Sequence, residues 1–245
     1  MTRSEIHAMM TGGMATVAGG VLAAYVGFGI SAGHLLAASL MSAPAALVVS
    51  KIIYPETEPS PTRGSVEIAF KVNEVNAFEA ACNGAAEGLK LALNVGAMLI
   101  AFIGLVALLN MMLGTVGSWF GLELSMELIL GRIFQPLAFV MGIPWSESLL
   151  VGRLLGEKMV LNEFISYIHL SEAIKEGSLS ERSVTISTYA LCGFANFSSI
   201  AVQIGGLSSL EPDRKRDFAA CGFRSMLGGT LAAFMTACIA GFLIA

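Results

Sequence analysis

The sequence predicts an all-α integral membrane protein with several spanning helices. Hydrophobic residues make up 55% of the 245 positions and charged residues 13%, which is about half the charged fraction of an ordinary soluble domain. Four stretches carry no Asp, Glu, Lys or Arg: 8–50, 91–122, 183–210 and 225–245. A spanning helix needs about 20 mostly apolar residues, so the first stretch holds two spans and the others one each. The weaker alternative, a soluble bundle, requires a polar face on nearly every helix.

Charge and cysteine content exclude other classes of protein. The net charge is −4, and no basic face of the kind that nucleic-acid binding requires is indicated. The four cysteines lie far apart in the sequence and form no C-x-x-C pair, so neither a disulfide framework nor a metal site is predicted. They are Cys82, Cys192, Cys221 and Cys238.

The first half of the chain divides into four segments. Residues 1–53 contain two spans, and the first of these is rich in glycine, which is typical of close helix packing or of a broken helix. Residues 54–90 are predicted to form a polar loop followed by an interfacial helix. Residues 91–113 form the plainest lipid-compatible helix, and 114–143 a shorter helix that is interfacial or partly buried.

Residues 144–245 differ in kind. Two short apolar stretches within 144–170 flank a polar tip, and neither reaches spanning length. This pattern predicts a re-entrant hairpin, which is tolerated only where protein or a water-filled cavity surrounds it. The span predicted over 184–205 has a polar centre at 192–199, and a last span covers 223–244.

Three polar groups fall at membrane depth: Thr11–Thr16, Asn162 with Glu163, and Asn196 with Ser198 and Ser199. A buried carboxylate costs at least a few kcal/mol in a membrane protein, so Glu163 needs a reason. It could pair with Lys158 at the hairpin tip and serve structure alone. A hairpin tip beside interrupted helices is, however, the arrangement from which secondary-transporter sites are built.

The residue types suggest the chemistry of a ligand. A carboxylate such as Glu163 accepts two hydroxyl protons in strong, charge-assisted hydrogen bonds, so together with Asn196 and Ser199 it suits a vicinal diol. The ring of Phe194 offers a face to a flat heterocycle, and ordinary helix packing is the equally weighted alternative.

Two segments carry a family resemblance. Asn162–Tyr167, N-E-F-I-S-Y, looks like the N-E-F-V-A-Y segment of concentrative nucleoside transporters, and Tyr189–Ile200, Y-A-L-C-G-F-A-N-F-S-S-I, resembles the longer second signature of that family. The opening Met9–Thr16, M-M-T-G-G-M-A-T, also fits. The resemblance covers essentially the whole chain.

The resemblance implies a polytopic helical transporter with re-entrant hairpins and discontinuous helices. It would import nucleosides across the plasma membrane, the inner membrane in a bacterium, by symport with sodium or protons. It implies a homotrimer resting on the helix around 91–113, an elevator-like movement, no enzymatic activity and no cofactor besides the coupling ion.

The resemblance also implies roles for individual residues. Glu163 and Asn196 should bind the ribose hydroxyls. The remaining substrate-binding positions and the partial sodium site are Phe194, Ser199, Asn162, Val21 facing the base, and Thr16 with the carbonyl of Val17.

One element of the family is expected upstream of Met1: a first re-entrant hairpin with a G-Q-T-E motif, which occurs nowhere in these residues. The chain would then correspond to the C-terminal part of a longer transporter. The alternatives are a membrane scaffold or remnant subunit without transport activity and, with less support, an intramembrane enzyme, since no nucleophile–base pair stands beside Glu163.

Overall fold

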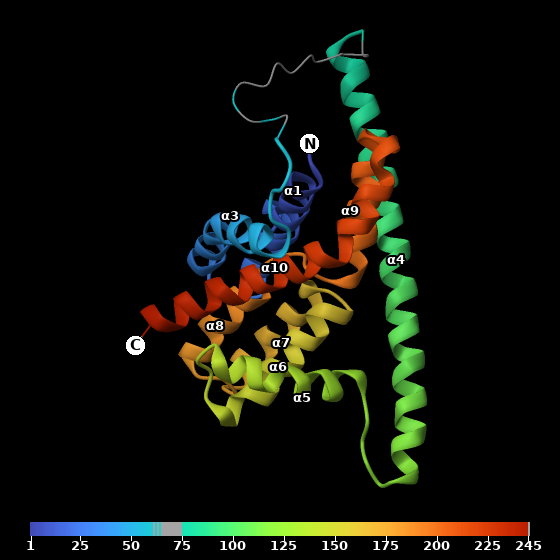
Figure 1. The fold of residues 1–245 in the computed structure, drawn as a ribbon. Coiled ribbons are helices and arrows are strands. Elements are labelled where there is room, and N and C mark those ends of the chain that lie inside the picture. Colours follow the sequence, from blue (N-terminus) through green and yellow to red (C-terminus); the bar gives the residue numbers. More distant parts are fainter. Residues whose placement is uncertain (61, 63, 65–74, 245) are drawn as a thin grey trace.

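The computed structural model describes residues 1–60, 62, 64 and 75–244, and every regular element in this part of the chain is helical (Figure 1). The first four helices are α1 (Arg3–Ala15), α2 (Gly19–Gly27), α3 (Ala32–Ile53) and α4 (Ala77–Trp119). The others are α5 (Met126–Val140), α6 (Trp145–Val160), α7 (Glu163–Lys175), α8 (Glu181–Leu191), α9 (Phe197–Leu210) and α10 (Lys215–Leu243), which a short 3-10 turn (Pro212–Arg214) precedes.

Three helical stretches of the described residues are long and apolar enough to cross a membrane. They are Arg3–Gly27, which comprises α1 and α2, then Ala32–Ile53, and Pro212–Leu243. The prediction of an all-α membrane protein is therefore confirmed.

Two interrupted helices and one helical hairpin give the fold its character. The first interruption lies between α1 and α2, where Thr16 and Ala18 have extended backbone. The second lies between α8 and α9, and α6 and α7 form the hairpin. An asparagine begins the helix that follows the hairpin tip and the helix that follows the second interruption. Asn162 accepts from the backbone N–H of Ile165 at the start of α7, and Asn196 accepts from that of Ser199 at the start of α9. Such N-caps satisfy backbone donors that a helix start leaves unpaired.

The long helix α4 stands along one side of the body formed by the other helices (Figure 1). It runs unbroken through the boundary expected at residue 90, because Asn76 caps its start and neither proline nor a turn follows before Trp119. Part of the predicted 54–90 segment, namely residues 61, 63 and 65–74, lies outside the described residues. Large apolar side chains such as Ile100, Leu108 and Met111 are exposed along α4, so this helix presents an apolar surface to lipid or to another protein.

Glycines bring α5 and the hairpin helix α6 into close contact. A Cβ atom on Gly152 would lie 2.5 Å from the carbonyl oxygen of Gly131, and one on Gly156 would lie 2.5 Å from the Cβ of Leu130. Asn110 of α4 donates to both carboxylate oxygens of Glu127, at 2.9 and 3.0 Å. The hairpin is thus packed on α5, and the first turn of α5 is hydrogen-bonded to α4.

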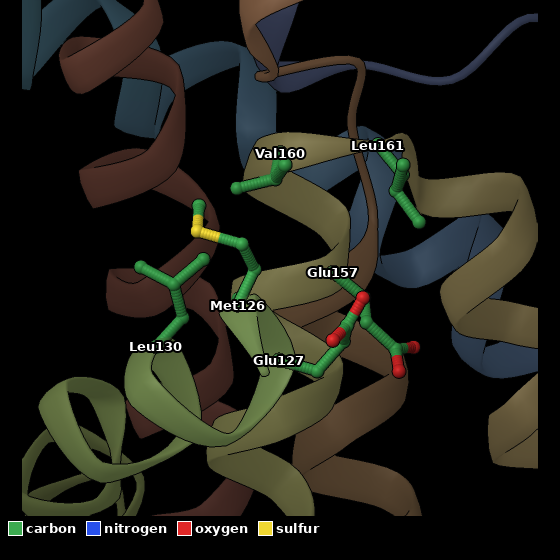
Figure 2. A pocket seen from close by; sticks show the side chains of 7 residues that line it. Met126, Glu127, Leu130, Glu157, Val160 and Leu161 are labelled. Carbon is green, nitrogen blue, oxygen red and sulfur yellow. The ribbon is translucent and has the colours of Figure 1, made fainter. Parts of the chain in front are cut away.

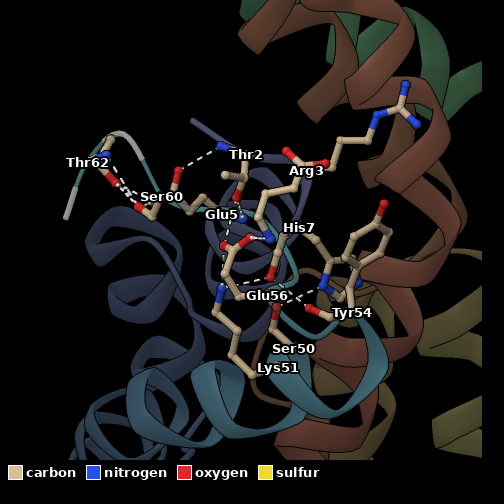
Figure 3. A network of polar contacts seen from close by, with 12 residues as sticks. Thr2, Arg3, Glu5, His7, Ser50, Lys51, Tyr54, Glu56, Ser60 and Thr62 are labelled. Atoms are coloured by element: carbon tan, nitrogen blue, oxygen red, sulfur yellow. Dashed lines mark hydrogen bonds and ion pairs between the residues drawn. The ribbon is translucent and has the colours of Figure 1, made fainter.

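A polar network joins the start of α1 to the end of α3 and the loop that follows (Figure 3). Thr2 donates to Glu56 at 2.8 Å, and Lys51 lies 3.5 Å from the same carboxylate. The hydrogen bond from Thr2 lowers the pKa of Glu56 below its ordinary value. One turn deeper, the buried ring of His7 lies 2.7 Å from the hydroxyl of Ser50, so α1 and α3 are joined both at the surface and inside.

Replacing Gly152 by alanine should destabilise the fold. The added methyl would meet backbone atoms of α5, the 2.5 Å contact with Gly131 among them, and overpacking of this kind costs about 1–3 kcal/mol. Thermal unfolding of the purified protein in detergent measures the effect. Gly84→Ala on α4 is the control, because nothing lies within 4 Å of its added Cβ. Equal unfolding temperatures for the two variants would contradict tight α5–α6 packing.

Candidate functional site

Glu163 is the first residue of α7, and its side chain is buried, with 4% of its surface exposed. The hydroxyl of Tyr25 in α2 donates to Oε1 at 3.3 Å, and the amide of Asn196 donates to Oε2 at 3.0 Å. The start of a helix also favours a negative charge, because its unpaired N–H groups give it a partial positive charge. The carboxylate is therefore stabilised from α2, from α7 and from the second interrupted helix.

Asn196 has two functions in this arrangement. Its Oδ1 accepts from the backbone N–H of Ser199 at 2.8 Å and from the hydroxyl of Ser198 at 2.7 Å, while its Nδ2 donates to Glu163. The residue that begins α9 is thus also the residue that fixes the carboxylate. Because an amide nitrogen carries two hydrogens, one further donor remains for a ligand.

The two helix interruptions meet at Gly193. This residue has a φ of +111°, and a Cβ atom there would lie 2.8 Å from the carbonyl oxygens of both Met14 and Ala15. Only glycine fits, for both reasons. The end of α1 and the break after α8 are therefore in direct contact, which places Thr16 beside the segment that carries Asn196.

Lys158, in the last turn of α6, is buried with 2% of its surface exposed, and its ammonium donates to the carbonyl of Ala190 at 2.9 Å. Ala190 lies in the last turn of α8, where carbonyl groups favour a positive charge. No ion pair within 4.0 Å joins Lys158 to Glu163 in the described part of the chain. The direct pairing considered from the sequence is not formed.

The other substrate positions expected from the resemblance differ in how the structure places them. Asn162 is buried, and its side-chain oxygen caps α7. Val21 packs on the large core cluster to which Tyr25 belongs. Ser199 and Phe194 are half-buried on either side of Asn196. Hydrogen bonds thus join Glu163, Asn196 and the backbone N–H of Ser199. Phe194 takes part through its backbone, since its carbonyl accepts from the N–H of Asn196 at 2.9 Å.

Thr16 and Val17 lie at the end of α1, where the chain leaves the helix. Both are half-buried, and the Thr16 hydroxyl donates to the carbonyl of Gly12 at 3.1 Å. Hydroxyl and carbonyl oxygens at an interrupted helix are the groups that bind sodium in membrane transporters. The oxygens of Met14 and Ala15 face Gly193 at the same place, so the donor set fits a small hard cation. Among the described residues no cluster of His, Cys, Asp and Glu suits a transition metal.

A shallow recess lies apart from this group, between α5 and the hairpin (Figure 2). The carboxylates of Glu127 and Glu157 lie at one end of it, and Met126, Leu130 and Val160 supply apolar side chains. The carboxylate of Glu127 accepts hydrogen bonds from the side-chain amide of Asn110. The carboxylate of Glu157 lies 2.7 Å from Nδ1 of His169. The recess contains none of the polar residues at the two interruptions, so we do not assign it to the site.

Sequence reasoning missed Tyr25. Its ring is fully buried, with its centroid 4.1 Å from that of Tyr167, and its hydroxyl reaches Glu163. A signal was available, because a tyrosine inside a charge-free span requires a partner for its hydroxyl. The partner could not be identified from the sequence, since it lies 138 positions away.

The fold and the site define a class of protein: a helical membrane protein in which a hairpin tip and two interrupted helices meet at one buried polar centre, the architecture of secondary transporters. The family described as "Na+ dependent nucleoside transporter C-terminus" matches residues 34–241. The chain belongs to this family.

Comparisons with individual relatives support the same family. The chain is 48% identical to mouse solute carrier family 28 member 3 over 258 aligned residues, and 50% identical to nucleoside permease NupC of Helicobacter pylori over 248. These alignments cover 99% and 100% of this chain but only 37% and 59% of the relatives. The solved structure of CNTnw in an inward-facing substrate-bound state matches with a TM-score of 0.84 at 44% identity, covering 98% of this chain and 57% of that one. The chain thus spans between about a third and six tenths of the length of these relatives.

Replacing Asn196 by alanine should cost more stability than the loss of a helix cap alone. The change removes the N-cap of α9, about 1 kcal/mol, and also leaves Glu163 buried with one donor fewer, a further 1–3 kcal/mol or so. Asn76→Ala is the matched control, because Asn76 caps α4 with the same geometry, at 2.9 Å, and lies exposed. Thermal unfolding in detergent compares the two variants, and equal losses would show that the bond to Glu163 adds nothing.

Proposed function

We propose that the protein containing this chain imports nucleosides across the plasma membrane by symport with a cation. The proposed cation is sodium, with the proton as the alternative. The observation that carries the proposal is the bond between Glu163 and Asn196 at the meeting point of the hairpin and an interrupted helix. It occurs in a chain half identical to a nucleoside permease. The proposed activity is transport without catalysis.

The ribose is the part of the substrate that this geometry suits. An ionised carboxylate offers about four acceptor positions, and Tyr25 and Asn196 occupy two of those on Glu163. The other two are the complement of two vicinal hydroxyl donors. The second N–H of Asn196 and the hydroxyl of Ser199 can donate to the same sugar oxygens. Val21 and Phe194 would lie against the base.

Cation coupling is assigned to the end of α1. The Thr16 hydroxyl and the Val17 carbonyl would contribute to a sodium site that is completed by groups outside these two residues. The name of a relative 42% identical to this chain, sodium/nucleoside cotransporter 1 of mouse, supports sodium over protons. When bound, the ion would supply positive charge beside the loop that carries Asn196.

The apolar surface of α4 supports a proposal about the assembly and its location. We propose that this helix is part of the scaffold on which a homotrimer assembles within the lipid bilayer, since its exposed side chains include Leu93, Ile100, Leu108 and Met111. The partners are then nucleosides, lipid and two further copies of the protein, with no nucleic acid.

Replacing Glu163 by glutamine should weaken uridine binding by about 10- to 100-fold, because a hydrogen bond to a charged group contributes about 1.5–3 kcal/mol. Calorimetric titration of the protein expressed from its complete gene measures the affinity. Glu172→Gln is the control, since Glu172 lies exposed on the same helix. The wild type should bind 2′,3′-dideoxyuridine more weakly than uridine by a similar factor. In the E163Q variant the two ligands should bind with nearly equal affinity, because the carboxylate that binds the hydroxyls is already gone. Unchanged uridine binding in E163Q would refute the assignment.

Replacing Thr16 by valine should raise the sodium concentration that gives half-maximal uridine uptake by roughly tenfold, the effect of losing about 1.4 kcal/mol of ligand interaction. Uptake into proteoliposomes over a series of sodium concentrations measures this. Thr115→Val is the matched control, because Thr115 also donates to the carbonyl four residues earlier but lies exposed on α4. Wild-type uptake driven by a proton gradient, with no response to sodium, would instead assign proton coupling.

A further inference from the structure

Tyr25 contacts the Glu163 carboxylate, although it is not among the positions expected from the family resemblance. It lies in α2, its side chain is fully buried, and its hydroxyl donates to Oε1 of Glu163 at 3.3 Å. The amide of Asn196 donates to the other oxygen, Oε2, at 3.0 Å. The two oxygens of one carboxylate are therefore held from two different interrupted helices.

Aromatic side chains of α7 hold the ring of Tyr25. The centroid of the ring lies 4.1 Å from that of Tyr167, with an interplanar angle of 30°, and 6.1 Å from that of Phe164. Phe28, at the end of α2, packs edge-on against Phe164 at 5.3 Å, and its carbonyl accepts from the hydroxyl of Ser171 at 2.6 Å. Packing of this kind locks a side chain that supports a binding group, so the phenol oxygen has a defined position relative to the start of α7.

Tyr167 offers a comparison, because it is equally buried but bonds to a different kind of acceptor. Its hydroxyl donates to the backbone carbonyl of Thr188 at 2.7 Å. A buried hydroxyl needs an acceptor of some kind, and a backbone carbonyl meets that need without affecting a ligand. Tyr25 instead bonds to the residue that we assign to the ribose, so its hydroxyl can affect binding as well as folding.

A carboxylate that binds a ligand must have its plane fixed. The last torsion of a glutamate side chain has broad, roughly two-fold preferences, so one donor alone leaves the group free to turn about the bonded oxygen. A tyrosine hydroxyl carries one hydrogen to donate, and here that hydrogen fixes Oε1 while Asn196 fixes Oε2. The remaining acceptor positions of Glu163 then point in set directions.

We propose that Tyr25 is a positioning residue that makes the site selective for the ribose hydroxyls by fixing the orientation of the Glu163 carboxylate. This inference rests on the proposed function, in which Glu163 binds the ribose. Tyr25 acts through Glu163 and not through the base. Its loss should therefore weaken the binding of a nucleoside that carries both hydroxyls and leave one without them almost unaffected.

The experiment compares uridine with 2′,3′-dideoxyuridine, which lacks both ribose hydroxyls. The protein expressed from its complete gene is titrated with each ligand in a calorimeter, and the readout is the dissociation constant of dideoxyuridine divided by that of uridine. Tyr25→Phe should lower this ratio about 3- to 10-fold, which is less than a well-aligned bond to a charged group contributes. The smaller effect is expected because 3.3 Å exceeds the range of about 2.5–3.0 Å that is usual for O–H···O bonds.

Two further variants separate positioning from packing. Tyr167→Phe removes a hydroxyl from the ring stacked on Tyr25 without removing a bond to Glu163, so it should lower the unfolding temperature and leave the ratio unchanged. Adding Y25F to E163Q should not change the ratio of E163Q, because the carboxylate that Tyr25 positions is gone. Such a double-mutant cycle isolates the coupling between the two residues.

Each outcome decides the inference. A folded Y25F protein with the wild-type ratio overturns it, and so does an equal weakening of both ligands, which a packing defect would produce. If Y25F cannot be purified, competition by dideoxyuridine against labelled uridine uptake in intact cells gives the ratio. A Y25F protein that is absent from the membrane assigns Tyr25 to folding alone and also overturns the inference. Wild-type protein that does not bind uridine overturns the proposed function itself.

Discussion

A carboxylate inside a membrane protein is costly to bury, and much of this structure is arranged around holding Glu163 in place. The residue stands at the start of α7, where the helix end favours its charge, and it accepts from Tyr25 and Asn196. Asn196 can reach it only because the helix is broken between α8 and α9. That break is possible only because Gly193 adopts a positive φ against the carbonyls of Met14 and Ala15. Two interrupted helices and the hairpin are therefore one interdependent unit, and a change in any of them alters the setting of the carboxylate.

Close packing extends this unit outward. Gly152 lets α6 approach the backbone of α5, and Gly156 lets it approach the side chain of Leu130. Gly228 and Gly229 of α10 make room in the same way for Thr11 and Met14 of α1. In a membrane, contacts of this kind and buried polar bonds replace the hydrophobic driving force that holds soluble helices together. The helix α4 lies outside this packed body along one side (Figure 1), joined to α5 by the bond from Asn110 to Glu127. The arrangement separates a dense body that contains the polar centre from a long helix with an apolar, exposed surface.

The sequence was sufficient for the fold class because long charge-free stretches predict spanning helices and polar or glycine-rich interruptions predict breaks. The structure places the first break between two glycine pairs, 12–13 and 19–20, and the second beside Gly193, Asn196 and Ser198. The sequence was also sufficient to single out Glu163 and Asn196, since polar side chains at membrane depth are rare. It could not show that α4 continues upstream of residue 90, because polar residues such as Glu79 and Glu87 also fit a separate interfacial helix. Nor could it show that Lys158 turns to the carbonyl of Ala190 and not to Glu163. That choice depends on where α8 ends in space, and partners more than 30 positions apart leave no local pattern.

The contact between the two interruptions also gives a physical basis for the coupling proposed between a cation and a substrate. A cation bound by Thr16 and Val17 would lie within the same turn of chain as the Met14 and Ala15 carbonyls that meet Gly193. Gly193 stands three residues before Asn196, whose amide fixes the carboxylate proposed to bind the sugar. An ion that holds the end of α1 in one position therefore also holds the break after α8, and with it the donor that orients Glu163. Because coupling free energies between two binding sites are reciprocal, a sugar that fixes Asn196 must favour the cation by the same factor. The proposed coupling would then need no long pathway, since Gly193 would join the two proposed sites.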